Sequence, residues 1–202
     1  MFAFEDRRRK QWGGAALAVL LPWGVASQRA KAVETDLTYP LQAPRACAQG
    51  EHFSLVAVGD LLLHTNIQNT GEKRGYPYLF DPTRPYLAGA DVAYANFEGT
   101  VMPKKPLSSF PSFNYSPKLP GAVKGAGFDV VSLSNNHALD TGMEGVDTTL
   151  DAIDGAALLH HGTAKQGQKH PPYVQVPVKN AKGAELKLGL VSLTFGTNNT
   201  HD

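Results

Sequence analysis

Residues 128–145 (FDVVSLSNNHALDTGMEG) carry the densest group of side chains that can bind a ligand. A short apolar run with β-branched residues, typical of a buried strand, ends at Asn135, Asn136 and His137. Asp140 follows three positions later. In α/β folds ligands bind at the carboxyl ends of strands, which is where these side chains would lie. Asn, Asp and Gly are also ordinary turn and cap residues, so this segment alone is equally compatible with a structural turn.

Two further segments repeat the pattern of an apolar strand followed by ligand-type residues. Residues 52–59 (HFSLVAVG) predict a buried strand, and Asp60 comes directly after it. Residues 91–96 (DVAYAN) predict another strand, which ends in Asn96 and leads to Glu98. The three loops are separated by about forty residues each, the spacing of strand–helix–strand units in a parallel sheet.

Parallel neighbours would bring these three loops to one edge of a sheet. There the carboxylates of Asp60 and Glu98 would meet a carboxamide oxygen and an imidazole, a donor set that suits a hard or borderline metal ion. Three unrelated structural turns are the alternative, but the recurrence of the pattern favours a shared metal site.

The segments between these loops supply helices and one long loop. Residues 82–88 and 119–126 have the signals of short helices, the second of them ended by a glycine. Residues 143–153 place apolar side chains at helical spacing. Residues 103–117, rich in Pro, Ser, Lys and Phe, predict a long loop of the kind that often binds ligands.

The last part of the chain has the pattern of β structure. Residues 158–161 predict a short strand on which His160 and His161 point to opposite faces, so the two do not chelate one ion. Residues 173–178 and 186–193 predict two strands joined as a hairpin.

Composition bounds the class of protein. The 202 residues, 42% of them hydrophobic, are enough for one domain with a real core. The net charge of +1 and the absence of a basic stripe argue against a nucleic-acid-binding protein. Cys47 is the only cysteine, which excludes an internal disulfide and a thiolate metal cluster.

The N-terminus has the pattern of a bacterial export signal. A basic segment (7–10, RRRK) precedes an apolar one (13–26), and Ala-Lys-Ala at 30–32 fits a cleavage site. The apolar segment is shorter than the roughly twenty residues of a membrane helix. We therefore predict a signal peptide at 1–32, a linker at 33–50, and an exported protein of the periplasm or cell envelope. A disordered tail or an uncleaved anchor is the alternative.

Four segments together resemble the CapA family, the PgsA-type proteins of poly-γ-glutamate capsule synthesis. They are VAVGD (56–60), ADVAYANFEG (90–99), GFDVVSLSNNHALDTGMEG (127–145) and LVSLTFGTN (190–198). NNHALDTG is the most specific of the matching pieces. The resemblance implies an α/β fold of the calcineurin-like metallophosphatase type, a four-layer α/β/β/α sandwich of which residues 51–202 are the N-terminal portion.

The resemblance also implies a role for each candidate residue. Asp60, Glu98 and Asn136 fall on metal-binding positions for two divalent ions of Mn, Zn or Mg. His137 falls beside the scissile or transferred group as a general acid. Three polar neighbours are expected to bind substrate: Asn96, Asn135 and Asp140.

Two features depart from the pattern. The Asp-x-His that opens the general metallophosphoesterase motif is replaced here by Gly59-Asp60. The His and Glu motifs that complete the metal cage in family members do not follow Asn136 in this sequence. We therefore expect weak metal binding and little activity from these 202 residues alone.

The implied function is the synthesis, anchoring or export of capsule poly-γ-glutamate through a metal-dependent, hydrolase-like site. The substrate would be an anionic polymer or a phosphorylated precursor, and a membrane-bound capsule synthase complex would be the partner. Two alternatives stay open. One is a non-catalytic accessory subunit of a membrane polymer synthase, and the other is a metallophosphoesterase with a different substrate, such as a nucleotide.

Overall fold

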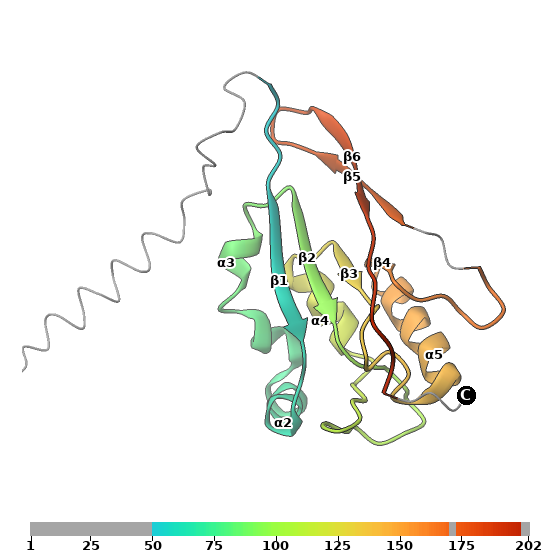
Figure 1. The fold of residues 1–202 in the computed structure, drawn as a ribbon. Helices are drawn as coiled ribbons and strands as arrows, with labels where there is room; N and C mark the ends of the chain where they lie inside the picture. Colours follow the sequence, from blue (N-terminus) through green and yellow to red (C-terminus); the bar gives the residue numbers. More distant parts are fainter. Residues whose placement is uncertain (1–49, 170–172, 199–202) are drawn as a thin grey trace, which may run out of the picture. The chain divides into compact units, whose positions relative to one another are not determined.

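A parallel sheet of four strands organises the computed structural model, which describes residues 50–169 and 173–198 (Figure 1). Its strands lie side by side in chain order: β1 (Leu55–Leu61), β2 (Val92–Phe97), β3 (Val130–Ser132) and β4 (Leu159–His161). Because all neighbours are parallel, the carboxyl ends of the strands share one edge. This confirms the mixed α/β class and the parallel arrangement predicted from the loop spacing. The predicted signal peptide and nearly all of the predicted linker lie outside the described residues.

β1 is a strand at the edge of this sheet. The sequence predicted a buried strand at 52–59, and the prediction of burial was wrong, because most residues of β1 are exposed. Among the described residues β1 pairs only with β2, which leaves its outer edge uncovered. The register is irregular: Ala57 pairs with Tyr94, and Asp60 pairs with Asn96. β1 therefore carries one residue more than β2 over this stretch.

Helices cover one face of the sheet. α4 (Leu119–Ala126) ends where predicted, at Gly127, whose φ of 115° is a conformation that glycine adopts without strain. α5 (Gly142–Gly155) confirms the helix predicted from the apolar spacing. Side chains of the sheet and of both helices form one buried cluster that includes Ala93, Phe97, Val131, Leu119, Val123, Val146, Leu150 and Ile153.

An antiparallel hairpin packs against the other face. It consists of β5 (Val174–Lys179) and β6 (Glu185–Leu190), which confirms the predicted hairpin, although β6 ends three residues early. Two valines of β5 form a second core cluster with two valines of the sheet: Val176, Val178, Val92 and Val130. The described residues therefore stack helices, a parallel sheet and a β-hairpin.

A helical region after β1 was not expected from the sequence. α2 (Thr65–Arg74) is followed by a 3₁₀ helix, η1 (Tyr76–Phe80), and by the predicted short helix α3 (Arg84–Leu87). α2 lacks an apolar stripe, and tertiary contacts hold it instead. The buried Gln68 amide donates to the carbonyls of Leu63 and Ser108 at 3.0 and 2.7 Å. None of the described helices has the length and apolar character that crossing a membrane requires.

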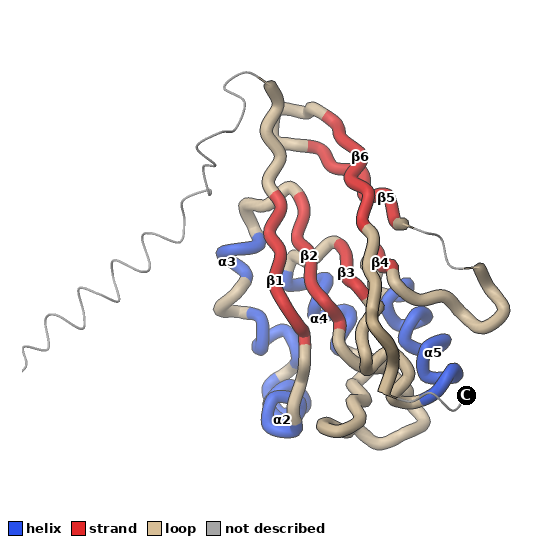
Figure 2. Tube along the Cα trace, viewed as in Figure 1, coloured by secondary structure: helices blue, strands red, loops and turns tan. Residues whose placement is uncertain are grey.

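The long loop predicted at 103–117 is present between β2 and α4 and is drawn in tan in Figure 2. The buried side chain of Asn114 organises it. Its Oδ1 accepts from the Met102 N–H at 2.7 Å, and its Nδ2 donates to the carbonyls of Met102, Lys105 and Pro106. One loop residue, Phe113, then reaches the carboxyl edge of the sheet.

Candidate functional site

Two carboxylates from different strands meet at this edge. The Nδ2 of Asn96 donates to Asp60 Oδ1 at 2.8 Å and to Glu98 Oε2 at 3.0 Å. Because one amide nitrogen reaches both carboxylates, Asp60 and Glu98 lie next to each other. The parallel register makes this possible, since Asp60 pairs directly with Asn96. The structure thus brings together the two acidic residues that the sequence predicted to share a site.

The surroundings of Glu98 disfavour the ionised form of its carboxyl group. Burial raises the pKa of Glu98 above its ordinary value, and the neighbouring Asp60 raises it further, while His137 acts in the opposite direction. Among the described residues, no Lys or Arg forms an ion pair with either carboxylate. Two close carboxylates without a basic partner favour the uptake of a proton or a cation.

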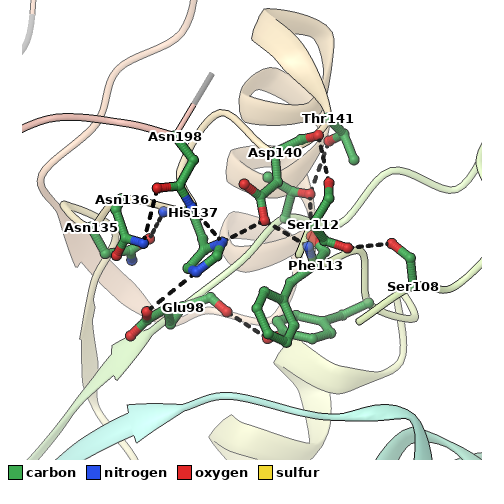
Figure 3. Close-up of polar contacts among 12 residues, drawn as sticks. Glu98, Ser108, Ser112, Phe113, Asn135, Asn136, His137, Asp140, Thr141 and Asn198 are labelled. Carbon is green, nitrogen blue, oxygen red and sulfur yellow. Dashed lines mark hydrogen bonds and ion pairs between the residues drawn. The ribbon is translucent and has the colours of Figure 1, made fainter. Parts of the chain in front are cut away.

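A buried histidine–aspartate pair lies beside Glu98 (Figure 3). His137 Nδ1 lies 2.7 Å from Asp140 Oδ2, and their side chains are only 9% and 1% exposed. Asp140 Oδ2 also accepts from the Phe113 N–H at 2.6 Å. The contact fixes the tautomer in which Nδ1 carries the proton. His137 Nε2 is then directed toward Glu98, with 3.9 Å between Nε2 and Oε1.

Two further residues lie close to the ring of His137. The Phe113 ring packs edge-on against it, with 4.7 Å between ring centroids. Asn198, from the segment after β6, places its Nδ2 3.2 Å from His137 Nδ1. Asn198 is also tied to Asn136: its N–H donates to the Asn136 carbonyl at 2.8 Å, and its Oδ1 accepts from Asn136 Nδ2 at 3.3 Å. Sequence reasoning assigned no role to Asn198.

The two adjacent asparagines of the loop play different parts. The buried Asn135 donates from Nδ2 to Asn96 Oδ1 at 3.2 Å and accepts from the His137 N–H at 3.1 Å. It therefore links the carboxylate pair to the histidine. Asn136, predicted as the metal ligand, is exposed and turned toward Asn198. Its ligand role, and the substrate role predicted for Asn96, Asn135 and Asp140, stay predictions.

Comparison with known proteins places this arrangement in a family. Residues 54–202 match the family model described as bacterial capsule synthesis protein PGA_cap. The chain belongs to this family. The resemblance drawn from the four sequence segments is thereby confirmed, and it covers the sheet, its helices and the candidate site.

Two curated relatives carry the same kind of name, and a third has an uninformative one. The chain is 28% identical over 175 residues to capsule biosynthesis protein CapA of Bacillus anthracis, covering 84% of this chain and 40% of that protein. It is 26% identical over 96 residues to PGA biosynthesis protein CapA of Bacillus subtilis, covering 46% and 25%. A similar match, 27% over 139 residues, joins it to protein y4sH of Sinorhizobium fredii, covering 65% and 29%. The chain thus matches less than half the length of each of these relatives.

A buried tyrosine, which the sequence did not single out, joins two loops of the site in this family member. The Tyr115 hydroxyl donates to the Glu98 carbonyl at 2.5 Å and accepts from the Leu63 N–H at 3.2 Å. Burial raises the pKa of Tyr115, so the hydroxyl stays protonated and able to donate. The chain segments that follow β1 and β2 are thereby held at a fixed separation. The only signal in the sequence was an aromatic residue within a largely polar loop.

The paired carboxylates of the site are ligands that suit a hard cation. Within the described residues, no three side chains of His, Cys, Asp or Glu are grouped so as to hold a metal ion by themselves. The two carboxylates of Asp60 and Glu98 supply the anionic oxygen ligands that Ca²⁺, Mg²⁺ and Mn²⁺ prefer, while the Asn96 amide turns its Nδ2 toward both of them. His137 Nε2 lies 3.9 Å from Glu98 Oε1, so a cation held by Glu98 would be close to the imidazole.

Proposed function

We propose that this chain takes part in the synthesis of a bacterial capsule through a metal-dependent, hydrolase-like site acting on poly-γ-glutamate or on a phosphorylated precursor. Family membership supports the capsule role. One structural observation supports the chemistry: the paired carboxylates of Asp60 and Glu98 lie beside a buried His137–Asp140 pair. A four-layer α/β/β/α sandwich, with residues 51–202 as its N-terminal portion, is the fold that this proposal implies.

Asp60 and Glu98 would hold the divalent ions, two in number, and the carboxamide of Asn136 would add a neutral oxygen. When bound, such ions polarise a carbonyl or phosphoryl oxygen and activate water. The raised pKa of Glu98 supports this role, because a cation relieves the repulsion between the two carboxylates.

His137 would act as the proton donor to the leaving group. Its Nδ1–H is engaged by Asp140, so the proton available for transfer is on Nε2, the atom that faces Glu98. The buried Asp140 carboxylate stabilises the imidazolium and fixes the ring orientation. We assign Asp140 a positioning role in place of the substrate contact predicted from the sequence, since its side chain is 1% exposed and its Oδ2 contacts Phe113 and His137.

The proposal also includes export. The basic and apolar segments within residues 1–32 would direct the protein to the periplasm or cell envelope. There it would meet an anionic polymer as it leaves a membrane-bound capsule synthase. The net charge of +1 and the absence of a basic stripe agree with a function that does not involve nucleic acid.

Deletion and complementation in the source bacterium test this function. Loss of the gene should remove the surface polymer, measured by γ-linked glutamate released from the envelope, and the wild-type gene should restore it. His137→Gln and Glu98→Gln should fail to restore it despite normal protein levels. Full restoration by both variants would show a non-catalytic accessory subunit, and an unchanged polymer in the deletion strain would remove the capsule role.

A further inference from the structure

A second histidine, His64, lies near the candidate site. It follows Asp60 by four positions and directly precedes α2. The ring of Phe113 packs edge-on against both His64 and His137, with 5.4 and 4.7 Å between ring centroids. Phe113 is only 1% exposed. The two imidazoles therefore share one buried neighbour at the carboxyl edge of the sheet.

Backbone contacts fix the position of His64. Its carbonyl accepts from the N–H groups of Ile67 and Gln68 at 2.9 and 3.0 Å, in the first turn of α2. The hydroxyl of the next residue, Thr65, lies 2.9 Å from the hydroxyl of Ser109 in the long loop. The segment that carries His64 is thus tied to the same loop that supplies Phe113.

The imidazole of His64 is free to bind a ligand. The residue is exposed, and within the part of the chain that the structure describes its ring nitrogens take part in no hydrogen bond or ion pair. His137, in contrast, is engaged by Asp140. An imidazole has at least one N–H that it can donate to an anion, and its protonated form adds a positive charge.

The proposed polymer substrate carries one carboxylate on every unit. In an extended γ-linked chain successive carboxylates are about 6 Å apart, as the bond lengths of the five-bond repeat determine. With the reacting bond at His137, the carboxylate of the neighbouring unit is repelled by Asp60 and Glu98 wherever their cation does not shield it. His64 offers that carboxylate an N–H at a comparable distance, because it and His137 pack on the same phenyl ring.

We propose that His64 binds an anionic group of the substrate, next to the bond that His137 serves. This inference rests on the proposed function and adds a residue that selects a substrate with negative charge beside the reacting bond. In the polymer the anionic group is the carboxylate of the neighbouring unit. A phosphorylated precursor would present the same chemistry, anionic oxygens that accept from an N–H.

Binding of γ-linked tri-glutamate to the full ¹⁵N-labelled chain in excess Mg²⁺, followed by NMR, tests the proposal. We expect saturable shifts at His64 and about tenfold weaker binding to His64→Phe, which keeps a ring against Phe113 but has no N–H. His64→Gln retains a donor and should bind within about threefold of wild type. His52→Phe is the matched control, since it changes an exposed histidine before the opposite end of β1 and should leave the affinity unchanged.

Two further ligands identify the group that is bound. A trimer with its α-carboxylates converted to amides should bind wild type and His64→Phe equally. Inorganic phosphate is the probe for a precursor, and a loss confined to phosphate in His64→Phe would assign His64 to that source.

Equal affinity of wild type and His64→Phe for both anions, or no saturable binding of either anion to wild type, would overturn the proposal. The amide spectrum of each variant verifies its fold, and His64 is exposed, so its replacement does not disturb the core. The measurement needs no turnover. Its failure is therefore distinguishable from a failure of the capsule assay in the deletion strain.

Discussion

His137 Nδ1 and a carboxylate oxygen of Asp140 lie 2.7 Å apart, and the aspartate side chain is 1% exposed. The two residues are three positions apart in a loop that the sequence alone describes equally well as a turn. In the folded chain the same carboxylate oxygen accepts from the Phe113 N–H, so the histidine is fixed to the long loop after β2 as well as to its own loop. The orientation of the imidazole therefore depends on contacts between two loops that are distant in the sequence.

Asp140→Asn should change the tautomer of His137. The amide that replaces the carboxylate can donate to Nδ1, which would move the ring proton to Nε2. ¹⁵N chemical shifts of the imidazole measure this directly, and the Asp140→Asn gene should fail to restore the surface polymer in the deletion strain. Asp154→Asn is the matched control, because Asp154 contacts the more exposed His160 at 3.1 Å. An unchanged His137 tautomer would contradict the positioning role.

Asp60→Ala should abolish metal binding. We expect the wild-type chain to bind Mn²⁺ weakly in calorimetric titration, with a dissociation constant above about 10⁻⁴ M, as in weak oxygen-ligand sites. The variant should show no binding, because half of the carboxylate charge is gone. Asp81→Ala removes a carboxylate that pairs with Arg84 at the surface and should have no effect. Tight binding that disappears in Asp60→Ala would show that our expectation of a weak site is wrong.

Glu98→Gln should stabilise the metal-free chain at neutral pH. Burial and Asp60 raise the pKa of Glu98 in the folded state, so the folded chain keeps a proton that the unfolded chain loses. Stability of the wild type therefore decreases as the pH rises from the ordinary glutamate pKa through the raised one. The glutamine has no such proton to lose.

Thermal unfolding in EDTA at several pH values measures this difference. The melting temperature of Glu98→Gln relative to wild type should increase between about pH 4 and pH 7. Glu185→Gln provides the control, since that side chain is 76% exposed. A difference that is constant with pH would contradict the raised pKa.

Tyr115→Phe should lower the free energy of unfolding by about 1–3 kcal/mol, the usual cost of leaving buried polar groups without partners. The change leaves the Leu63 N–H and the Glu98 carbonyl without the hydroxyl that now joins them. Urea denaturation measures the loss, and weaker Mn²⁺ binding should accompany it. Tyr86→Phe, at a residue that is 45% exposed, should change neither quantity.

Residues 1–50 fused to a periplasm-dependent reporter such as alkaline phosphatase should export it. The basic segment, the apolar segment and the Ala-Lys-Ala site predict cleavage after residue 32. Mass spectrometry of the N-terminus of the exported fusion verifies the site. A fusion that begins at residue 33 should stay inactive, and equal activity of both fusions would refute the export signal.

The sequence predicted the site best where strand geometry determines position. Parallel strands bring their carboxyl ends to one edge, so the meeting of Asp60 with Glu98 followed from periodicity and spacing alone. The contacts that distant loops make with the site could not be predicted in this way. Tyr115 reaches Leu63 across 52 residues, and Asn198 reaches His137 across 61, and neither contact leaves a local pattern. The polar helix α2 was missed for the same reason, because packing against other segments stabilises it.

The extra residue in β1 explains why its aspartate is available at all. In a regular alignment Gly59 would face Asn96, and Asp60 would pair with Phe97, whose side chain is completely buried under the helices. Side chains alternate between the faces of a sheet, so the Asp60 carboxylate would then point into the apolar core on the side of Phe97. Burying an unpaired charge there has a large energetic cost. The cost of burying the Asp60 carboxylate therefore disfavours the regular strand alignment and favours the irregular one. The extra residue therefore keeps the Asp60 carboxylate exposed and beside Asn96.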